Sequence, residues 1–558
     1  MKKFEEEKLE NLFLEKKFTK ESHKTLFYLQ EIQNEFGYLS YEHMNYLAEF
    51  LDIHNSQIES IVSFYKFFNL ENVKYTIRIC HTISCDLKNK DRIIKGFENE
   101  LGIQMGEITA NREFQLSFCS CLGMCDRAPA ILINDRLFSK VSPSQIPQII
   151  EACKNNRLNE DFPETIISTV HFENRLIITT HKGISIKNAL KNSPDEILQT
   201  LKEVNLRGRG GAGFPTWKKW ELAKISPDTT KYVVCNADEG EPGTFKDRFL
   251  LHKYFGKIIE GMIIAGYTIG AQKGIIYLRG EYLYLVPTIK KVLKEYETDK
   301  LLGNNFEIEL RMGMGAYVCG EETALIESLE GKRGEPRNRP PYPIDTGYLD
   351  KPTIVNNVET FYDIALIFEL GNEYFNKFGT KDSRGLKLFS VSGDLEAEGV
   401  YVIPYGTTLQ ELVEMTRAKN IYAIVVGGAQ GEIIKKDDFN KILAFEALPS
   451  GGSIILLNKN RDLLTVLQNF LEFFVEESCG QCTPCRLGVN ELLNGVIELK
   501  KGKLSLNKLN KLIELANTIK LSSKCGLGTG SVNGFLSLVE NFKEDILGRI
   551  EGEKHGNS

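Results

Sequence analysis

Residues 208–220 read GRGGAGFPTWKKW, and this stretch decides how the middle of the chain is interpreted. Its glycines at positions 208, 210 and 213 match G-x-G-x-x-G, which in a Rossmann fold follows a strand and opens a helix. Residues 193–196 (SPDE) instead form a capping box, which predicts a helix running on to Leu206, just before the glycines. Phe-Pro at 214–215 interrupts the segment after the glycines. The stretch is therefore predicted to be a glycine-rich loop and not a Rossmann turn.

The length of the chain, 558 residues, predicts about three to five domains. Lys and Arg total 69 against 75 Asp and Glu, a net charge of -6, and no basic stripe suggests a nucleic-acid partner. The N-terminus lacks the apolar core of a signal peptide. The longest apolar stretch, around residues 258–271, contains Glu260 and is too short to span a bilayer. We expect a cytoplasmic protein without membrane insertion.

The first third of the chain is predicted to contain a helical bundle followed by a small α/β domain. In residues 1–73, Gly37 is a plausible helix end and Asn55 a plausible cap for a further helix. The first of these helices has an apolar face of Leu26, Leu29, Ile32 and Phe36. Residues 74–153 begin with the strand YTIRIC and include a second strand, AILI of AILIND. Residues 154–192 are interpreted as a polar linker that contains an extended RLIITT.

The remaining two thirds divide into three predicted domains. Residues 193–380 alternate strands and helices, and a polar, glycine-containing stretch follows each β-rich run. Residues 386–457 are predicted to form a small β-rich domain with a helix capped by Thr408. Residues 460–550 are helical, with apolar residues at helix spacing. The fold class is thus multidomain, α/β and α+β.

The cysteines form two groups and three isolated positions. Twelve cysteines in a cytoplasmic chain are not expected to form disulfides. ESCGQCTPCR places three of them at C-x2-C-x2-C, with a fourth thiolate available later, a pattern that favours a [4Fe–4S] cluster. A structural zinc ion is the alternative. The predicted ligands are Cys479, Cys482, Cys485 and Cys525.

The N-terminal group has pairs at C-x4-C and C-x3-C, each at the end of a strand-like run. Two pairs on adjacent loops can hold a [2Fe–2S] cluster. Cys119, two residues before Cys121, is a rival ligand, and buried structural cysteines are the alternative interpretation. The predicted ligands are Cys80, Cys85, Cys121 and Cys125. Isolated Cys153, Cys235 and Cys319 are expected to pack as small apolar side chains.

Two further stretches place polar residues after predicted strands. MGMGAYVCGEETAL opens a helix near Gly320, where backbone amides can approach a phosphate, although Glu321 and Glu322 can also serve the helix dipole. CNADEGEPG groups carboxylates at a strand end, where open α/β sheets bind ligands; a solvated acidic turn is the alternative.

Taken together, these motifs resemble the NADH-oxidising flavoprotein subunit of respiratory complex I and its soluble relatives. The resemblance rests on residues 208–220 and on CNADEGEPGTFKDR, GAYVCGEETALIESLEGKRGEPR, PTIVNNVET and ESCGQCTPCR. IQNEFGYLS, VSFYKFF and CLGMC, with the C-x4-C pair, resemble that complex's thioredoxin-like [2Fe–2S] subunit. The resemblance implies a thioredoxin-like domain, a non-classical Rossmann-like FMN and NAD domain, a ubiquitin-like β-grasp domain and a four-helix-type [4Fe–4S] domain.

The resemblance also implies the cofactors FMN and NAD(H) and the residues that bind them. For FMN these are Gly208, Arg209, Gly210, Lys219, Asn236, Asp238, Glu239, Gly320, Glu321, Glu322, Asn356 and Asn357. For NAD they are Gly211, Ala212, Gly213, Phe214, Lys219, Glu241, Glu322, Arg339 and Tyr342. Trp217 and Leu222 depart from the family, which commonly has a glycine and an aromatic residue there. No side-chain acid or base is needed, because the flavin accepts the hydride and releases electrons singly.

The fusion of both parts in one chain resembles the diaphorase flavoprotein subunit of cytoplasmic NAD-reducing [NiFe] hydrogenases. CLGMCDRAPAILIN and SSKCGLGTG are closer to that branch than to the respiratory one. The implied partners are an iron–sulfur electron-transfer subunit and hydrogenase subunits. Respiratory complex I and NAD-dependent formate dehydrogenase are alternative settings for the same module, and a non-catalytic NAD-sensing scaffold is an alternative of another class.

Overall fold

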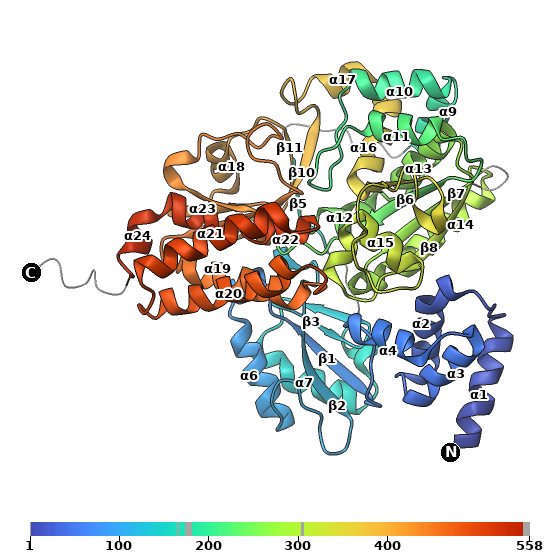
Figure 1. Cartoon of the computed structure of the whole chain (residues 1–558), viewed down its shortest axis with the longest axis horizontal. Helices are drawn as coiled ribbons and strands as arrows, with labels where there is room; N and C mark the ends of the chain where they lie inside the picture. Colours follow the sequence, from blue (N-terminus) through green and yellow to red (C-terminus); the bar gives the residue numbers. More distant parts are fainter. Residues whose placement is uncertain (1, 164–166, 173–180, 303–305, 551–558) are drawn as a thin grey trace, which may run out of the picture.

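The computed structural model describes residues 2–163, 167–172, 181–302 and 306–550. Its first unit is a group of helices at one end of the molecule (Figure 1). Leu26, Leu29 and Ile32 are buried as predicted, and Gly37 ends its helix with a φ of 84°. The helices are α1 Lys2–Glu15, η1 Ser22–Lys24, α2 Thr25–Phe36, α3 Tyr41–Leu51 and α4 Asn55–Phe64.

The predicted cap at Asn55 is wrong by one residue. His54 occupies the N-cap position of α4, and its backbone N–H donates to the side chain of Gln57 at 3.2 Å. The amide of Asn55 instead donates to Glu59, one turn further along the same helix, at 2.9 Å. Asn55 is therefore the first helical residue, since its side chain is committed to a partner within the helix.

The second unit has a four-stranded sheet of order β2-β1-β3-β4. β1 pairs parallel with β2, so the two strand-like runs that precede the cysteine pairs end at the same edge, with Cys80 opposite Cys119. The loops after these two strands are therefore neighbours. The elements are β1 Tyr75–Cys80, α5 Ile83–Leu87, α6 Lys90–Leu101, β2 Phe114–Cys119, η2 Cys125–Arg127, β3 Ala130–Ile133, β4 Arg136–Ser139, η3 Pro143–Gln145, α7 Ile146–Lys154 and α8 Leu158–Asp161.

The third unit is built on a parallel four-stranded sheet of order β8-β7-β6-β9. Its strands are β6 Tyr232–Ala237, β7 Lys273–Leu278, β8 Glu307–Met312 and β9 Thr353–Asn357. Its helices are α9 Ile184–Ala189, α10 Pro194–Glu203, α11 Thr216–Ile225, α12 Lys246–Lys253, α13 Phe255–Ile269, η4 Gly280–Leu285, α14 Val286–Thr298, η5 Tyr317–Gly320, α15 Glu322–Leu329, η6 Tyr348–Asp350, α16 Val358–Leu370 and α17 Asn372–Asn376.

Two helices form the core of this third unit. α13 is apolar almost all round and buried, as expected for a helix enclosed by other elements. It packs against α16. A side chain at Gly261 would place its Cβ 2.1 Å from the carbonyl oxygen of Phe361, so only glycine permits this approach. Because all four strands are parallel, their polar carboxyl ends meet at one edge of the sheet.

The fourth unit is a six-stranded sheet of order β13-β12-β14-β10-β11-β5. The predicted strands are present, and Thr408 caps α18 by accepting from the N–H of Glu411, as expected. The elements are β10 Leu386–Gly393, β11 Gly399–Pro404, α18 Leu409–Thr416, β12 Ile421–Val426, η7 Gly428–Gln430, β13 Glu432–Lys435, η8 Lys436–Asp438 and β14 Ser453–Asn458.

The segment predicted to be a linker contributes to two other units. β5 Val170–Phe172 pairs parallel with β11 as the edge strand of the six-stranded sheet, and α9 packs on α13 and α16. This polar stretch forms a strand and a helix because each has a partner from later in the chain. The strand pairs with the edge of β11, and the helix packs on the apolar pair α13 and α16. The predicted extended RLIITT, residues 175–180, lies outside the described residues.

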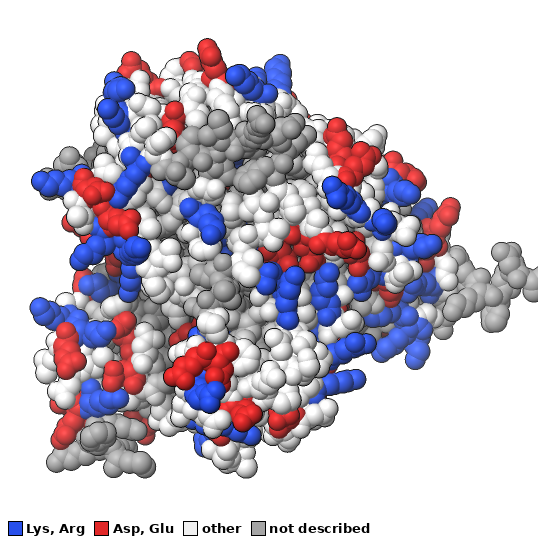
Figure 2. All heavy atoms as spheres, turned by 180° about the vertical axis from the view of Figure 1, so that it is seen from behind, with Lys and Arg blue, Asp and Glu red and all other residues white. Residues whose placement is uncertain are grey.

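The last unit is helical, as predicted, and lies at the end of the molecule drawn in red (Figure 1). Its helices are α19 Leu463–Glu477, α20 Thr483–Lys500, α21 Leu506–Ser522, α22 Gly526–Gly530, α23 Asn533–Asn541 and α24 Lys543–Leu547. Among the described helices, none combines the length and apolar character needed to cross a membrane. Figure 2 shows acidic and basic side chains intermixed over much of the face behind that of Figure 1.

Candidate functional site

The glycine-rich loop lies between two helices, α10 and α11. The N–H of Gly208 donates to the carbonyl of Phe214 at 3.0 Å, which closes the loop at its base. Gly213 has a φ of 63°, and a Cβ there would come within 2.5 Å of Phe445. Since a helix and not a strand precedes the glycines, the prediction that this is no Rossmann turn is confirmed.

Arg209 is in this loop, but its side chain points elsewhere. The guanidinium is 1% exposed; it donates to Asp363 at 2.6 Å and to the carbonyl of Arg384 at 3.0 Å, and it lies over the ring of Tyr405. The prediction of a flavin contact is thereby corrected for the side chain, because all of these contacts are internal. The backbone of Arg209 also has internal partners, since its N–H donates to Thr360 at 3.0 Å and its carbonyl accepts from Lys387 at 3.4 Å.

The carboxyl ends of β6 and β9 bring four predicted residues together. Asn236 lies opposite Asn357 across the paired strands, and its amide donates to the carbonyl of Gly320 at 2.8 Å. Asn356 accepts from the indole N–H of Trp220 at 2.9 Å. Trp220 is fully buried and was not predicted to hold the site, although it is the last residue of the 208–220 stretch.

Asp238 supplies an unsatisfied group at this edge. Its Oδ2 is buried and has no hydrogen-bond partner within the part of the chain that the structure describes. Burial raises the pKa of this carboxyl well above its usual range. A buried oxygen of this kind needs a partner, and the ring N–H of a flavin fits it.

The two glutamates that come soon after Asp238 are not in a solvated turn, so that alternative is wrong. Glu239 accepts the N–H groups of Asp247 and Arg248 at 2.8 and 3.0 Å, which caps α12. Glu241 accepts from the hydroxyl of Tyr317 and from the N–H of Gln430 at 3.1 Å. Burial raises the pKa of Glu241 to about 7, against the lowering effect of these hydrogen bonds.

A second set of predicted residues is joined by charge. Lys219 donates to Glu322 at 2.9 Å and to the carbonyl of Val355 at 3.1 Å. Arg339 lies 3.6 Å from Glu321 and 3.8 Å from Glu322. Glu321 accepts from the N–H groups of the first turn of α15, so its alternative role at the helix terminus is confirmed.

The aromatic residues predicted to contact the nucleotide are accessible. Phe214 is 45% exposed and Tyr342 is 49% exposed. Trp217, which departs from the family pattern, lies under the ammonium of Lys202 at 4.9 Å from its ring centre. Gly211 faces the main chain of Gly451, with 3.7 Å between an added Cβ and the nitrogen. The loop therefore leaves flat rings and bare backbone for a ligand.

The four predicted N-terminal cysteines are buried and close together. The sulfurs of Cys121 and Cys125 are 3.3 Å apart. A hydrogen bond with Cys125 lowers the pKa of Cys121, but a hydrogen bond with Cys80 and burial outweigh it and raise this pKa to about 11. Cys85 likewise hydrogen-bonds with Cys80. Four thiols of this arrangement fit a [2Fe–2S] cluster as a donor set.

The C-terminal cysteines gather at helix starts. Cys482 is the N-cap residue of α20, Cys485 lies in its first turn, and Cys525 precedes α22. Burial raises the pKa of Cys485 to about 11. Across the described ranges, no three His, Cys, Asp or Glu side chains are arranged to hold a metal ion as they stand. Together with Cys479, these three cysteines make a set of four thiols, which fits a [4Fe–4S] cluster.

His81 takes part in a polar cluster beside these sites. Its Nε2 lies 3.1 Å from Glu476. The neighbouring Glu477, which was not predicted, accepts from Lys66 at 2.7 Å and from the N–H of Tyr317 at 2.9 Å. Sequence reasoning missed Glu477 because its partners are far away in the chain. Isolated Cys153, Cys235 and Cys319 are buried, as predicted.

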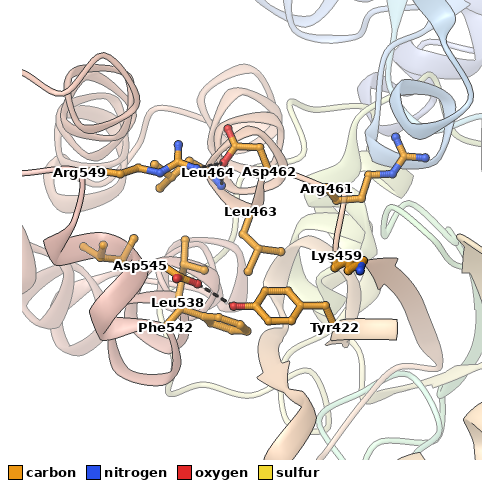
Figure 3. Close-up of a pocket in the computed structure, with 11 residues that line it drawn as sticks. Tyr422, Lys459, Arg461, Asp462, Leu463, Leu464, Leu538, Phe542, Asp545 and Arg549 are labelled. Carbon is orange, nitrogen blue, oxygen red and sulfur yellow. Dashed lines mark hydrogen bonds and ion pairs between the residues drawn. The ribbon is translucent and has the colours of Figure 1, made fainter. Parts of the chain in front are cut away.

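A separate cavity of about 360 Å³ lies between the six-stranded sheet and the C-terminal helices (Figure 3). Tyr422 donates to Asp545 at 2.7 Å on one side of it, and Arg549 pairs with Asp462 at 2.9 Å on another. None of the residues predicted to bind flavin, nucleotide or iron lines this cavity. It is therefore distinct from the candidate site.

Comparisons with known proteins define the class of the fold and site. The thioredoxin-like [2Fe–2S] ferredoxin family matches residues 13–154, the Nuo51 FMN-binding domain matches residues 201–366, and the NADH-ubiquinone oxidoreductase-F iron–sulfur binding region matches residues 465–549. The multidomain α/β fold with these three parts is as predicted.

Individual relatives narrow the class. NAD-reducing hydrogenase HoxS subunit alpha of Cupriavidus necator is 38% identical over 542 residues, which cover 92% of this chain and 90% of that protein. The F subunit of NADH-quinone oxidoreductase from Aquifex aeolicus is 39% identical over 65% of this chain and 87% of that protein. A crystal structure of NAD+-reducing [NiFe]-hydrogenase matches with a TM-score of 0.91 and 34% identity, over 96% of this chain and 94% of that chain.

The chain belongs to the family of NAD(H)-linked flavoprotein subunits that includes both the alpha subunit of NAD-reducing hydrogenase and the F subunit of NADH-quinone oxidoreductase. It is an oxidoreductase subunit. The predicted cofactors FMN, NAD(H), one [2Fe–2S] cluster and one [4Fe–4S] cluster are confirmed by the three family matches.

Proposed function

We propose that this chain is the diaphorase subunit of an NAD-reducing hydrogenase, which exchanges hydride with NAD(H) and single electrons with its iron–sulfur clusters. The observation that supports it best is the fusion: the hydrogenase alpha subunit spans 92% of the chain, whereas the Aquifex aeolicus oxidoreductase relative spans 65%. That difference disfavours a complex I subunit. A formate dehydrogenase remains the alternative setting, and a non-catalytic scaffold is disfavoured because flavin-loop and cluster residues are all present.

The residues of the loop and of the sheet edge would hold the flavin. FMN, when bound, accepts or donates hydride and passes electrons on singly. Asp238 offers it a hydrogen-bond acceptor, and Lys219 offers a cation beside Glu322. The remaining flavin contacts we propose are the backbone of Gly208, Arg209 and Gly210, the helix start at Gly320–Glu322, and the pocket floor of Asn236, Glu239, Asn356 and Asn357.

The nucleotide would lie on the exposed side of the same loop. Phe214 and Tyr342 offer rings for stacking, and Arg339 offers a cation to a phosphate. Glu241 would bind the adenosine ribose. The remaining contacts we propose are Gly211, Ala212, Gly213, Lys219 and Glu322. The role of the protein is to stack, to orient and to exclude water.

The finer fold and the setting belong to the same proposal. We infer a ubiquitin-like β-grasp domain at 386–457, supported by parallel β10 and β14 with antiparallel neighbours and α18. α19, α20, α21 and α23 support a four-helix-type domain at 460–550, and the parallel sheet supports a Rossmann-like domain at 193–380. Residues 1–73 and 74–153 are the bundle and the thioredoxin-like domain. We place the protein in the cytoplasm, with an iron–sulfur subunit and hydrogenase subunits as partners.

Anaerobically purified protein is expected to contain about six irons and one FMN per chain, because the two clusters together hold that much iron. Metal analysis and flavin extraction measure both quantities. The purified complex should also reduce NAD with hydrogen as the electron donor, which tests the hydrogenase assignment. Stoichiometric zinc with little iron would contradict the cluster assignment, while absent hydrogen-dependent activity in an iron-loaded complex would contradict only the partner.

The protein is expected to prefer NADH strongly over NADPH, because a carboxylate near the ribose repels a 2′-phosphate. Arg248 cannot receive that phosphate, since it is 0% exposed and paired with Asp126. The Glu241 carboxyl has a pKa of about 7 and is charged mainly above that pH, so the preference should grow from pH 6 to pH 8. Glu241→Gln should relax it by about 1–3 kcal/mol and remove the pH dependence.

Steady-state reduction of an artificial acceptor with each nucleotide measures this preference as a ratio of kcat/KM. Glu414→Gln, a change at an exposed acid on α18, is the matched control and should leave the ratio unaltered. Equal kcat/KM for NADH and NADPH in the unmodified protein would refute the assignment of Glu241.

A further inference from the structure

Residues 121–126, here called the ligand loop, contain two proposed ligands of the [2Fe–2S] cluster and are held from outside their own domain. Arg248 of α12 donates to both carboxylate oxygens of Asp126 at 2.9 Å and also to the carbonyl of Gly123. Arg248 is 0% exposed and Asp126 is 4% exposed. One nitrogen of the guanidinium reaches both oxygens while another bonds to the loop backbone, so this buried ion pair fixes position as well as charge.

A second arginine also holds the same loop. Arg279, 2% exposed, donates to the carbonyl of Cys121 at 2.5 Å and to the carbonyl of Glu239. The Nη2 atom that reaches Cys121 also pairs with Glu281, at 2.8 Å. One guanidinium therefore bonds both to the ligand loop and to Glu239, at the carboxyl edge of the parallel sheet where the flavin is proposed to bind, here called the flavin edge. Its positive charge lies close to both.

Tyr282 packs between the ligand loop and Glu239. It lies in η4, three residues after Arg279, and donates its hydroxyl to Glu239 at 2.7 Å. A Cβ at Gly123 would lie 2.2 Å from that hydroxyl oxygen, so the ligand loop must carry glycine where the tyrosine crosses it. Glu239 in turn accepts the backbone N–H of Arg248 at 3.0 Å. The ligand loop and the flavin edge thus share one buried, hydrogen-bonded junction.

The charges in this arrangement decide the sign of the electrostatic effect. Reduction adds one electron to the cluster and neither forms nor breaks a bond; in the working protein the electron comes from the reduced flavin. Net charge, hydrogen bonds and burial set the potential of such clusters. Asp126 directly follows the ligand Cys125, so without Arg248 a bare buried carboxylate would oppose the added electron. Without Arg279, the positive charge beside the carbonyl of Cys121 would be lost, and Glu281 would lose the cation with which it pairs.

We propose that Arg248 and Arg279 are positioning residues that hold the ligand loop against the flavin edge and raise the reduction potential of the [2Fe–2S] cluster. The inference rests on the proposed ligand set and assigns a role to two residues that bind neither flavin nor nucleotide. It also makes the potential of this cluster a property of the fused chain, because both arginines lie outside the thioredoxin-like domain.

The test is an EPR-monitored redox titration of the purified holoprotein, with dithionite as reductant. Arg248→Gln and Arg279→Gln should each shift the [2Fe–2S] midpoint to more negative values. The expected shift is at least a tenfold change in the ratio of reduced to oxidised cluster, or about 59 mV for one electron. Asp126→Asn, which leaves Arg248 unopposed, should shift it to more positive values, and the double variant Arg248→Gln with Asp126→Asn should lie near the parent.

Two controls belong to this test. The [4Fe–4S] midpoint in the same samples should not move, and Lys257→Gln, which removes a buried cation paired with Glu260 and Glu369, should move neither midpoint. Unshifted midpoints in both arginine variants, or shifts of the same sign in Arg248→Gln and Asp126→Asn, would overturn the proposal. Loss of the cluster from Asp126→Asn as well as Arg248→Gln would overturn the charge effect, leaving only a structural role. Absence of any [2Fe–2S] signal from the parent would instead refute the ligand set.

Discussion

Replacing Cys121 by alanine is expected to abolish the EPR signal of the [2Fe–2S] cluster, whereas Cys119→Ala is expected to retain it. The sulfur of Cys121 lies 3.3 Å from that of Cys125 and also hydrogen-bonds with Cys80. Cys119 is the last residue of β2, paired with Cys80 through the strand register. The chain leaves the strand there, so the alternation that would put both side chains on one side does not continue to Cys121.

The measurement is a low-temperature EPR spectrum of the reduced protein, together with iron content. The [4Fe–4S] signal of the same sample serves as the internal control, because its cysteines lie in another domain. Cys153→Ala, at another buried thiol, is the matched variant and should keep both signals. A retained signal in Cys121→Ala with loss in Cys119→Ala would reverse the assignment.

Glu359→Ala is expected to destabilise the protein by about 3–5 kcal/mol, the usual cost of breaking a buried ion pair by removing one partner. Glu359 is fully buried between two lysines, contacting Lys387 and lying 3.0 Å from Lys246. It also accepts the backbone N–H of Leu388 at 2.9 Å. Its loss leaves Lys387, which is 0% exposed, with carbonyl oxygens as its remaining hydrogen-bond partners among the described residues.

Urea unfolding followed by flavin fluorescence would measure this destabilisation as a lower midpoint. Asp438→Asn is the matched control, because Asp438 pairs with Lys441 at the surface, where such pairs contribute less than about 1 kcal/mol. A midpoint for Glu359→Ala equal to that of the control would show that the network holds little of the fold together.

Features governed by neighbouring residues could be predicted from the sequence. The capping boxes at Ser193 and Thr408 are present, because a cap needs only a side chain and an N–H three residues on. The helix predicted to run to Leu206 ends at Glu203, since Asn205 adopts a left-handed conformation with φ 48°. The cysteine groups could also be recognised, because their spacing alone is typical of clusters.

Features governed by distant partners could not be predicted. The family resemblance places Arg209 at the flavin, but the partner of its side chain, Asp363, lies in α16, far along the chain. The sequence marks Glu239 as a site residue, but its role as a cap for α12 depends on how the chain turns back after it. The alternative interpretations at Glu239 and Glu321 could be separated only by seeing which N–H groups each carboxylate accepts.

The pairing of β5 with β11 makes the order in which the domains assemble depend on the order in which the chain is synthesised. Val170 pairs with Val400, so the strand leaves the ribosome long before its partner exists. At ordinary rates of translation this interval is on the order of ten seconds or more. The thioredoxin-like domain can therefore fold while the chain is still growing, but the segment that follows it cannot take its place in the six-stranded sheet until β11 has emerged. Cofactor insertion into the N-terminal domain has the earlier part of that interval available, before Arg248 and Arg279 have emerged to enclose the ligand loop.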